Sequence, residues 1–227
     1  ELGKLAQQHG AWVRLHYVYP YPSVDEVIPL MATGRVLPYL DVPFQHSHPD
    51  VLKRMKRPAS GERNLERIQR WREACPEIVI RSTFIAGFPG ETEDDFNKMM
   101  KLIVDIHFDN SFSFIFSPRP GTPAAGLHDD TPHDVKLRRL QHLQSVINAN
   151  IKSISESRVG TVQRILVEGA SKRDAGELMG RTECNRVVNF AGQPRLVGQM
   201  VDVTITEAKA YTLRGEVLVR EGAPLTA

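Results

Sequence analysis

A glycine-rich turn between a predicted strand and a predicted helix carries the clearest chemical signal in this chain. Residues 78–86 form a mostly apolar run, which indicates a buried strand. Gly87 and Gly90 follow in a tight turn, and Glu91 begins a helix whose first turn is acidic. Backbone N–H groups at such a helix start suit a carboxylate or phosphate ligand. A plain connection in an α/β core is an equally good interpretation.

Arg81 and Ser82 lie inside this apolar strand. A buried arginine is costly unless its charge is paired. A ligand carboxylate would satisfy the guanidinium through charge-assisted hydrogen bonds. A salt bridge to an acid of a neighbouring helix is the alternative.

Elements alternate between strand and helix over the first half of the chain. The patterns predict strands at residues 12–17, 39–44, 78–86 and 111–116, and helices at residues 24–32, 50–55, 61–74 and 91–107. A Pro/Gly-rich loop at 117–130 and a long helix at 132–157 follow. This order implies a parallel sheet, open or barrel-like.

Ligands of parallel α/β folds gather at the carboxyl ends of the strands. Four segments are expected to meet there: residues 17–21, 45–46, 87–91 and 117–122. His46 and His48 have the spacing of a metal-binding pair, but no third ligand lies at a suggestive spacing. A polar loop at a strand end is the favoured interpretation, and no metal site is predicted.

Composition sets broad limits on function. The chain has 227 residues, is 41% hydrophobic and 25% charged, and carries a formal net charge of +2. Two distant cysteines exclude a disulfide framework and fit a reducing cytosol, so we expect a cytoplasmic protein. No apolar run is long enough to span a membrane. Basic residues crowd residues 53–72, which indicates either a surface for an anionic partner or a solvated helix face.

The pattern changes after Gly160. Short strands are predicted at residues 161–168, 180–190, 200–208 and 213–219, which suggests a small barrel of the oligonucleotide-binding type. We therefore predict two domains, 1–158 and 159–227. Polar and basic residues punctuate the second domain and are candidates for RNA binding: Arg164, Lys172, Arg173, Arg181, Asn185, Arg186 and Arg214. Acids lie among them, so an ordinary mixed-charge β surface is the alternative.

Three segments together resemble the radical S-adenosylmethionine (radical SAM) methylthiotransferases of the MiaB/RimO type. Residues 81–92 and 113–124 resemble the late barrel strands of that family, and residues 160–220 resemble its terminal TRAM domain. The resemblance implies the fold class α/β, with an incomplete parallel β/α barrel followed by a small all-β TRAM barrel. The Cys-x-x-x-Cys-x-x-Cys motif of the family is absent. We therefore expect a carboxy-terminal portion whose early barrel strands and cluster ligands lie outside this chain.

Two branches of the family are represented. Residues 12–75 resemble the branch that modifies an aspartate of a small-subunit ribosomal protein (RimO type). Residues 97–220 resemble the branch that modifies an adenosine beside the tRNA anticodon (MiaB type). Because the terminal domain is expected to hold the substrate, the tRNA branch is preferred. The ribosomal-protein enzyme is the alternative, and a non-catalytic RNA-binding remnant is an alternative of another class.

The resemblance also implies cofactors and positions for their contacts. The family uses S-adenosyl-L-methionine and iron–sulfur clusters to start radical chemistry, so a shielded pocket is required. The positions implied to contact or shape the cofactor site are Gln45, Arg81, Ser82, Gly87, Phe88, Pro89, Gly90, Glu91, Ser117, Arg119, Gly121 and Thr122. No catalytic residue is assigned. The expected partner is tRNA, the protein is expected to be a monomer, and this chain alone is expected to be inactive.

Overall fold

The structure is a computed structural model that describes residues 1–57, 61–172, 174 and 176–218. It divides into two compact units, Glu1–Asn150 and Ile151–Ala227. The division falls within a long helix, α6 (His133–Glu156), so the domain boundary after residue 158 stays a prediction. Among the described residues, no helix combines the length and the apolar character that crossing a bilayer requires.

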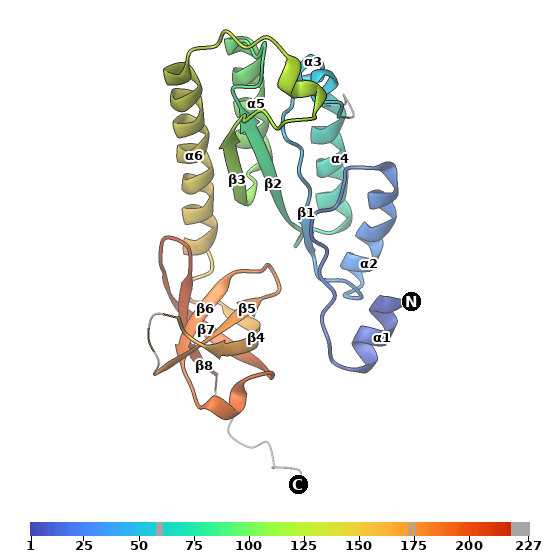
Figure 1. Ribbon diagram of the computed structural model, residues 1–227. Coiled ribbons are helices and arrows are strands. Elements are labelled where there is room, and N and C mark those ends of the chain that lie inside the picture. The colour runs from blue at the N-terminus through green and yellow to red at the C-terminus, as the bar shows by residue number, and fades with distance from the viewer. Residues whose placement is uncertain (58–60, 173, 175, 219–227) are drawn as a thin grey trace. The chain divides into compact units, whose positions relative to one another are not determined.

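The first unit is built on a parallel sheet of three strands (Figure 1). Its strands are β1 (Tyr39–Asp41), β2 (Val79–Ala86) and β3 (Asp109–Ile115), in the order β1-β2-β3. The helices α3 (Pro49–Arg54) and α4 (Gly61–Ala74) connect β1 to β2, and α5 (Glu93–Ile106) connects β2 to β3. This repeat of strand and helix confirms the predicted α/β class.

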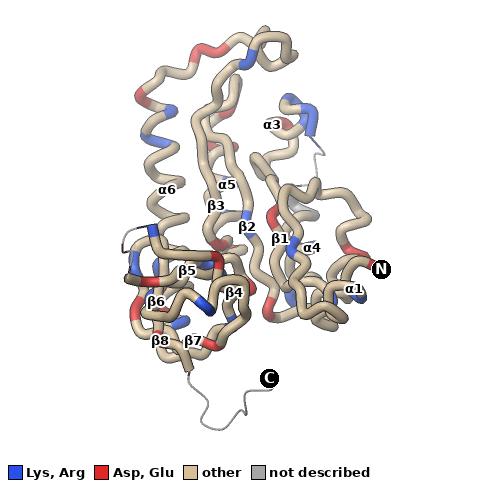
Figure 2. Tube along the Cα trace, turned by 60° about the horizontal axis from the view of Figure 1, so that its bottom comes forward, with Lys and Arg blue, Asp and Glu red and all other residues tan. Residues whose placement is uncertain are grey.

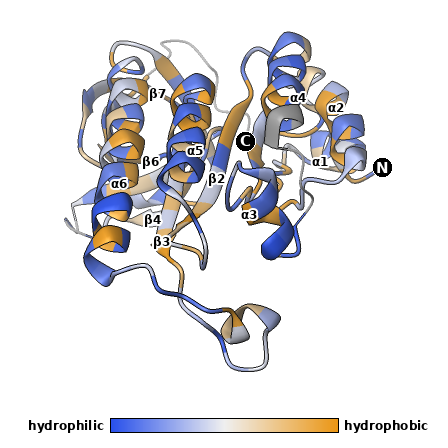
Figure 3. Ribbon diagram, turned by 90° about the horizontal axis from the view of Figure 1, so that it is seen from above, coloured by the Kyte–Doolittle hydropathy of each residue, from blue (hydrophilic) through white to orange (hydrophobic). Residues whose placement is uncertain are grey.

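One face of the sheet is covered and the other is open. Figure 3 shows α5 beside α6, where the Phe96 ring lies 6.0 Å from that of His142, and Arg72 of α4 donates to the Ile106 carbonyl of α5, so these helices form one layer. Ile80 and Phe84 point to this side and are at most 2% exposed, and the Phe84 ring lies 5.2 Å from that of Phe108. On β3, Phe112 is 45% and Phe114 is 55% exposed. Because these two aromatic side chains are exposed, the described residues leave this face of the sheet uncovered.

The amino-terminal segment corrects one prediction. The helix α1 (Leu2–Gln8) is followed by an extended segment, but residues 12–17 do not form the predicted strand. Only Leu15 forms a bridge, in parallel with Leu40 of β1. Tyr17 has a φ of 53°, which interrupts the extended conformation that a strand requires, although the N–H of Val18 still donates to the Asp41 carbonyl at 2.8 Å.

Two other predicted elements also differ from the prediction. The strand predicted at 39–44 ends at Asp41, and beyond it the N–H of Phe44 donates to the Ser82 hydroxyl at 3.1 Å and not to a backbone carbonyl, which interrupts the regular ladder. The helix predicted at 24–32 begins as the 3₁₀ segment η1 (Pro22–Val27) and becomes α-helical only in α2 (Ile28–Ala32). Pro29 stands in the first turn of α2, where a missing N–H costs nothing.

The second unit contains a closed barrel of five strands. They are β4 (Val162–Ala170), β5 (Glu177–Thr182), β6 (Val187–Ala191), β7 (Met200–Ala208) and β8 (Leu213–Val217), in the order β4-β5-β6-β8-β7. Alternate apolar side chains fill its interior, among them Ile165, Phe190 and Val203. The predicted small β-barrel is therefore confirmed.

The prediction of a single strand at residues 180–190 is wrong. This stretch contains parts of two antiparallel strands, β5 and β6, which are joined by a turn in which Asn185 has a φ of 67°. The N–H of Asn185 donates to the Thr182 carbonyl at 2.9 Å, and the N–H of Arg186 donates to the Thr182 hydroxyl at 3.0 Å. Asparagine tolerates this left-handed conformation better than most residues, so the turn was readable from the sequence.

A complete capping box begins α5. The N–H of Asp95 donates to the Thr92 hydroxyl at 3.1 Å, and the N–H of Thr92 donates to the Asp95 carboxylate at 3.0 Å. Burial alone would raise the pKa of Asp95. The Thr92 hydrogen bonds and the nearby His48 and His46 outweigh it, so the pKa lies below its ordinary value.

Replacing Thr92→Ala is expected to lower the free energy of unfolding by about 1 kcal/mol at pH 7, because it removes the cap. A depressed carboxyl pKa stabilises the fold above the unfolded-state value of about 3.9, and this contribution is lost as the pH falls through the folded-state pKa. The difference between variant and wild type should therefore shrink in acid.

Urea denaturation at pH 7 and below pH ~4 measures both effects. Thr33→Ala is the matched control, since its exposed hydroxyl donates to the Pro29 carbonyl at 3.1 Å at the other end of a helix. An equal loss in both variants would show that Thr92 has no special role.

Candidate functional site

The turn after β2 uses its own polar groups. Gly87 and Gly90 adopt φ values of 70° and 74°, which only glycine adopts readily. The N–H of Gly87 donates to both carboxylate oxygens of Glu91 at 3.1 Å, and the N–H of Glu91 donates to the Phe88 carbonyl at 2.8 Å. These two donors are therefore occupied within the turn and are not open to an external anion.

Glu91 is the centre of a buried charge cluster. Its side chain is fully buried, as is that of His46, whose Nε2 lies 3.4 Å from Oε2 of Glu91. Arg139 of α6 places Nη1 2.9 Å from Oε1 and donates a second bond to the Glu91 carbonyl at 3.0 Å. The carboxylate thus joins three separate segments, and its role is to shape this edge rather than to face a ligand.

The two histidines after β1 are also paired. His48 places Nδ1 3.1 Å from Oδ1 of Asp95, and its N–H donates to Nδ1 of His46 at 2.9 Å. Each histidine therefore meets a carboxylate of the segment that follows β2. The sequence alone gave no sign of these partners, because Glu91, Asp95 and Arg139 are distant from the histidines along the chain.

The carboxyl edge of the sheet brings several predicted positions together. Gln45 has a φ of 68°, and its backbone pairs with Thr83 and Ile85 of β2 at 2.8 Å. The ring of buried Phe88 lies 4.8 Å from that of Phe116 in an edge-to-face arrangement, so the turn after β2 adjoins the loop after β3. That loop exposes the remaining predicted residues, which are Ser117, Arg119, Gly121 and Thr122. Pro89 is buried in the turn.

Arg81 and Ser82 do not join this edge. Arg81 is six residues before Gly87, about 20 Å along an extended strand. Its Nε lies 3.8 Å from Oδ2 of Asp41 on β1, and its guanidinium stacks 4.0 Å from the centre of the Phe112 ring. The predicted alternative of a salt bridge is thus the one observed, although the acid lies on a strand and not on a helix.

Ser82 faces the opposite side of the sheet and is completely buried. Its hydroxyl accepts the N–H of Phe44 at 3.1 Å, and its own N–H donates to the Ser111 hydroxyl at 3.0 Å. These bonds hold the segment after β1 and the strand β3 against β2. Ser82 is therefore placed to support the sheet and cannot touch a ligand on the open face.

The small barrel distributes its predicted RNA-binding residues unevenly. Arg164 and Lys172 are exposed, whereas Arg186 is only 5% exposed and Arg173 lies outside the described residues. Arg181 lies 3.1 Å from Glu168 and donates to the Asn185 side chain at 3.3 Å, and Arg214 forms an ion pair with Glu177. Acidic and basic residues are mixed along this barrel in Figure 2. An RNA phosphate must therefore compete with carboxylates for two of these arginines.

The residues of this chain do not fit an iron–sulfur cluster. Within the described ranges, no group of three or more His, Cys, Asp or Glu side chains could hold a metal ion. Cys75 is buried in the first unit, and Cys184 is half-buried in the second. The donor set at the carboxyl edge does fit an amino-acid cofactor with a carboxylate, because Gln45, Ser117 and Arg119 offer neutral and cationic donors. The Thr122 hydroxyl already donates to the Arg119 carbonyl at 2.8 Å.

Comparison with known proteins agrees with this architecture. The family model of the radical SAM superfamily matches residues 1–103, and that of the TRAM domain matches residues 156–218. The chain is 72% identical over 193 residues to a tRNA-2-methylthio-N(6)-dimethylallyladenosine synthase of Paracidovorax citrulli, covering 85% of this chain and 43% of that protein. It is 49% identical over 229 residues to the ribosomal protein uS12 methylthiotransferase RimO of Leptothrix cholodnii, covering 96% of this chain and 49% of that protein.

The resemblance to radical SAM methylthiotransferases is confirmed.

The methylthiotransferase relatives are about twice as long as this chain, which spans about half of their length. A solved structure, the coproporphyrinogen III oxidase HemN of Escherichia coli, described as a radical SAM enzyme, has a TM-score of 0.54 at 14% identity. The match covers 96% of this chain and 55% of that structure. At this identity the likeness concerns the fold alone.

The Glu91 cluster leads to a stability prediction for this methylthiotransferase-like chain. Glu91→Gln is expected to lower the free energy of unfolding by about 3 kcal/mol, because it leaves the buried Arg139 guanidinium with the exposed Glu93 as its remaining counter-charge. Adding Arg139→Met should recover part of this loss, since the double variant buries no unpaired charge. Urea denaturation of the two single variants and the double variant measures the coupling.

Glu93→Gln is the matched control. Glu93 also lies 2.9 Å from Arg139, but its side chain is 64% exposed, so the expected loss is at most about 1 kcal/mol. Additive effects of Glu91→Gln and Arg139→Met would show that the two side chains are not coupled.

Proposed function

We propose that this chain is part of a radical SAM methylthiotransferase that installs a methylthio group on a tRNA adenosine beside the anticodon. The observation that carries the proposal is the 72% identity to a relative named tRNA-2-methylthio-N(6)-dimethylallyladenosine synthase. Relatives with the same name in Albidiferax ferrireducens and Delftia acidovorans are 63% and 66% identical over 212 residues. The product is then of the 2-methylthio-N6-isopentenyladenosine type.

The carboxyl edge of the sheet is proposed as one wall of the cofactor site. S-adenosyl-L-methionine with an iron–sulfur cluster supplies the radical chemistry of this superfamily, and we propose that residues outside this chain hold the clusters. The side chains at the edge that we propose to contact the cofactor are Gln45, Ser117 and Arg119. Their task is to orient the cofactor and to exclude water, because a radical in open solvent is quenched. In this proposal Glu91 and Arg139 do not contact the cofactor, and their ion pair fixes the position of the turn after β2.

The TRAM barrel is proposed to hold the RNA backbone. Arg164 and Lys172 are exposed, and Arg181 and Arg214 become available when their carboxylate partners are displaced. Arg186 is buried and is not part of this proposal. The cytoplasmic location and the monomeric state stay predictions.

The ribosomal-protein reaction is the second candidate. The match to the uS12 methylthiotransferase RimO covers 96% of this chain, more than the 85% of the tRNA relative with 72% identity. A non-catalytic RNA-binding role is the third, because the described residues include no metal-binding group. One experiment with three distinct outcomes separates these functions.

A chimera tests the proposed function directly. This chain replaces the matching region of the Paracidovorax citrulli relative, and the chimera is expressed in cells that lack both methylthiotransferases. Mass spectrometry of tRNA is expected to detect the 2-methylthio group on adenosine. The same mass shift on an aspartate of uS12 would favour the second candidate. Neither product from a soluble chimera that retains its cluster absorbance would favour the RNA-binding role.

The ion pairs on the barrel lead to a second prediction. Glu168→Gln removes the carboxylate that competes with RNA phosphates for Arg181, so the affinity for tRNA should rise, by up to about fivefold. The effect should be largest at low salt, because exposed charges are screened. Filter binding at several salt concentrations measures it.

Glu156→Gln is the matched control, because Glu156 is 58% exposed at the end of α6 and pairs at 3.8 Å with Lys152, which is not proposed to bind RNA. An equal gain in both variants would reflect net charge alone. A loss of affinity in Glu168→Gln would mean that the ion pair holds Arg181 in place for RNA.

A further inference from the structure

An aromatic segment beside β1 has no role in the proposed function. The N–H of Val18 donates to the carbonyl of Asp41 at 2.8 Å, so the segment begins at the level of Arg81. Tyr17 is 74% exposed and Tyr21 is 58% exposed. Tyr19 lies between them and is half-buried, with its ring centre 4.4 Å from that of Tyr21. Exposed aromatic rings are unusual for side chains that serve only to fill a core. They offer flat surfaces on which another ring can stack.

A group of cations borders this aromatic segment. Lys53, Lys56 and Arg57 lie on α3 and its carboxyl-terminal turn, where Asp50 is the one acid of residues 48–57. The Arg57 guanidinium stacks 5.0 Å from the centre of the Tyr19 ring. Its Nη1 is buried and has no hydrogen-bond partner among the described residues, so a phosphate would have to reach the other nitrogens of the guanidinium. We call these six residues the tyrosine–lysine rim: Tyr17, Tyr19, Tyr21, Lys53, Lys56 and Arg57.

Hydrogen bonds from α4 hold the aromatic segment of the rim in place. Arg67 of α4 donates from Nη1 to the Pro20 carbonyl at 2.9 Å and from Nη2 to the Tyr21 carbonyl, and its Nε lies 2.7 Å from Asp25. Trp71 donates to the same Asp25 carboxylate at 2.6 Å. The aromatic segment is therefore positioned before any ligand arrives, which reduces the entropy lost on binding.

The backbone of the rim is strained at two positions. Tyr17 and Lys56 adopt φ values of 53° and 56°, in the left-handed region that side chains other than glycine seldom occupy. Such conformations persist where the surroundings hold them in place, and they cluster at functional sites. Here they turn the chain at the two ends of the rim.

The rim borders the candidate cofactor edge. Arg54 of α3 donates to the Gly90 carbonyl at 2.9 Å, so α3 lies against the turn after β2. Figure 1 shows α3 at the same end of the sheet as the loop that follows β3, and Figure 2 shows basic residues at the end of α3. A substrate that enters over this edge passes the rim.

We propose that the tyrosine–lysine rim binds unpaired nucleotides of the substrate RNA next to the cofactor edge. Bases stack on the open faces of Tyr17 and Tyr21, and phosphates pair with Lys53, Lys56 and Arg57. Tyrosine rings also pack at protein interfaces, so the choice of RNA follows from the cations of the rim and from the tRNA function proposed above. The proposal rests on the proposed function and gives the first unit an RNA contact of its own, independent of the TRAM barrel.

Binding of a labelled RNA hairpin to the full chain tests the rim. The probes are a tRNA anticodon stem–loop and a blunt duplex of the same stem, both measured by fluorescence anisotropy. Tyr17→Ala with Tyr21→Ala is expected to weaken hairpin binding about tenfold or more, with an unchanged salt slope and little effect on the duplex. Tyr17→Phe with Tyr21→Phe keeps the rings and should bind like wild type.

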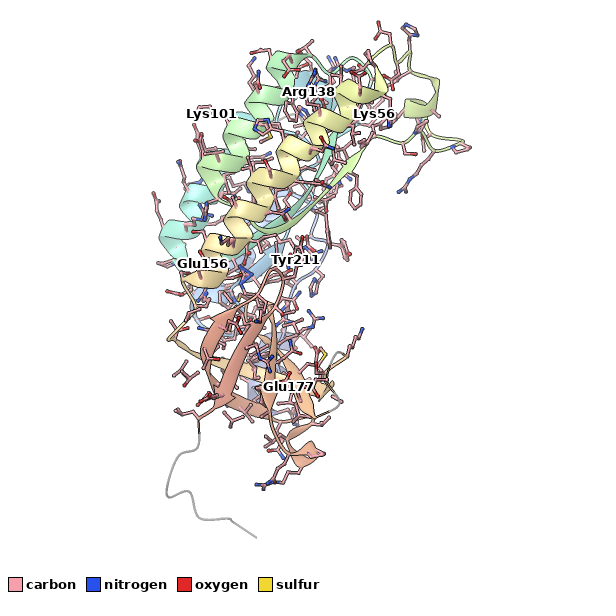
Figure 4. All side chains as sticks on the ribbon, turned by 90° about the vertical axis from the view of Figure 1, so that its left-hand side faces the viewer. Lys56, Lys101, Arg138, Glu156, Glu177 and Tyr211 are labelled. Atoms are coloured by element: carbon pink, nitrogen blue, oxygen red, sulfur yellow. The ribbon has the colours of Figure 1, made fainter. Side chains whose placement is uncertain are left out.

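The lysines are expected to give a different signature. Lys53→Glu with Lys56→Glu should weaken binding and reduce the salt slope by about 1.4, because single-stranded RNA contributes about 0.7 per phosphate contact. Lys98→Glu with Lys101→Glu is the control with the same change of charge, on exposed positions of α5. Figure 4 shows Lys101 projecting from the side of α5, away from Lys56. The control should leave the slope unchanged.

The outcomes separate the rim from the proposed function. If wild type binds the hairpin and both rim variants bind it equally well, the rim proposal is overturned while the tRNA function stands. If wild type binds neither RNA, both are overturned. If the rim variants lose affinity for a peptide of the uS12 loop but not for RNA, the rim recognises protein and the RNA proposal is wrong.

Discussion

The first unit depends on a single buried carboxylate. Glu91 accepts the N–H of Gly87 and lies against His46 and Arg139, so it connects the turn after β2 with the segment after β1 and with α6. A charge in this environment is stable only because every neighbour is a donor or a cation. The position of the turn, and with it the carboxyl edge, therefore follows from an ion pair and not from apolar packing alone.

The same principle separates the polar residues of the chain into two groups. Arg81, Ser82, Arg139 and Arg186 are buried, and the first three make their contacts within the protein. Gln45, the loop after β3 and the tyrosine–lysine rim keep polar or aromatic groups open at one edge. The proposed ligand contacts lie in the second group, because the side chains of the first group are buried.

Basic and acidic side chains are paired on the surface of the TRAM barrel. Its interior is apolar, while Arg181 and Arg214 on the outside are each paired with a carboxylate. Exposed ion pairs of this kind are weak, so a phosphate can replace the carboxylate at little cost. RNA binding to such a surface, as proposed above, is expected to be reversible and sensitive to salt.

Much of the fold could be predicted from the sequence, because its elements are encoded locally. The apolar run before Gly87, the helical spacing of α5 and the alternation in the small barrel each identified an element of the correct type. The errors fell on residues 12–17 and 180–190, where alternation predicted a strand but a backbone turn at Tyr17 or Asn185 interrupted it. The family resemblance, too, rested on contiguous motifs that needed no structure.

The sequence by itself determined the strand–turn–helix order, the two kinds of domain and the family. Only the tertiary structure decided which polar residues face a ligand. Glu91 and Arg139 are 48 residues apart, and the distance between Arg81 and the turn depends on the extended shape of β2. Burial and ion pairing arise when distant segments pack together, so no local pattern could show that Glu91 points inward while Tyr17 and Tyr21 remain open.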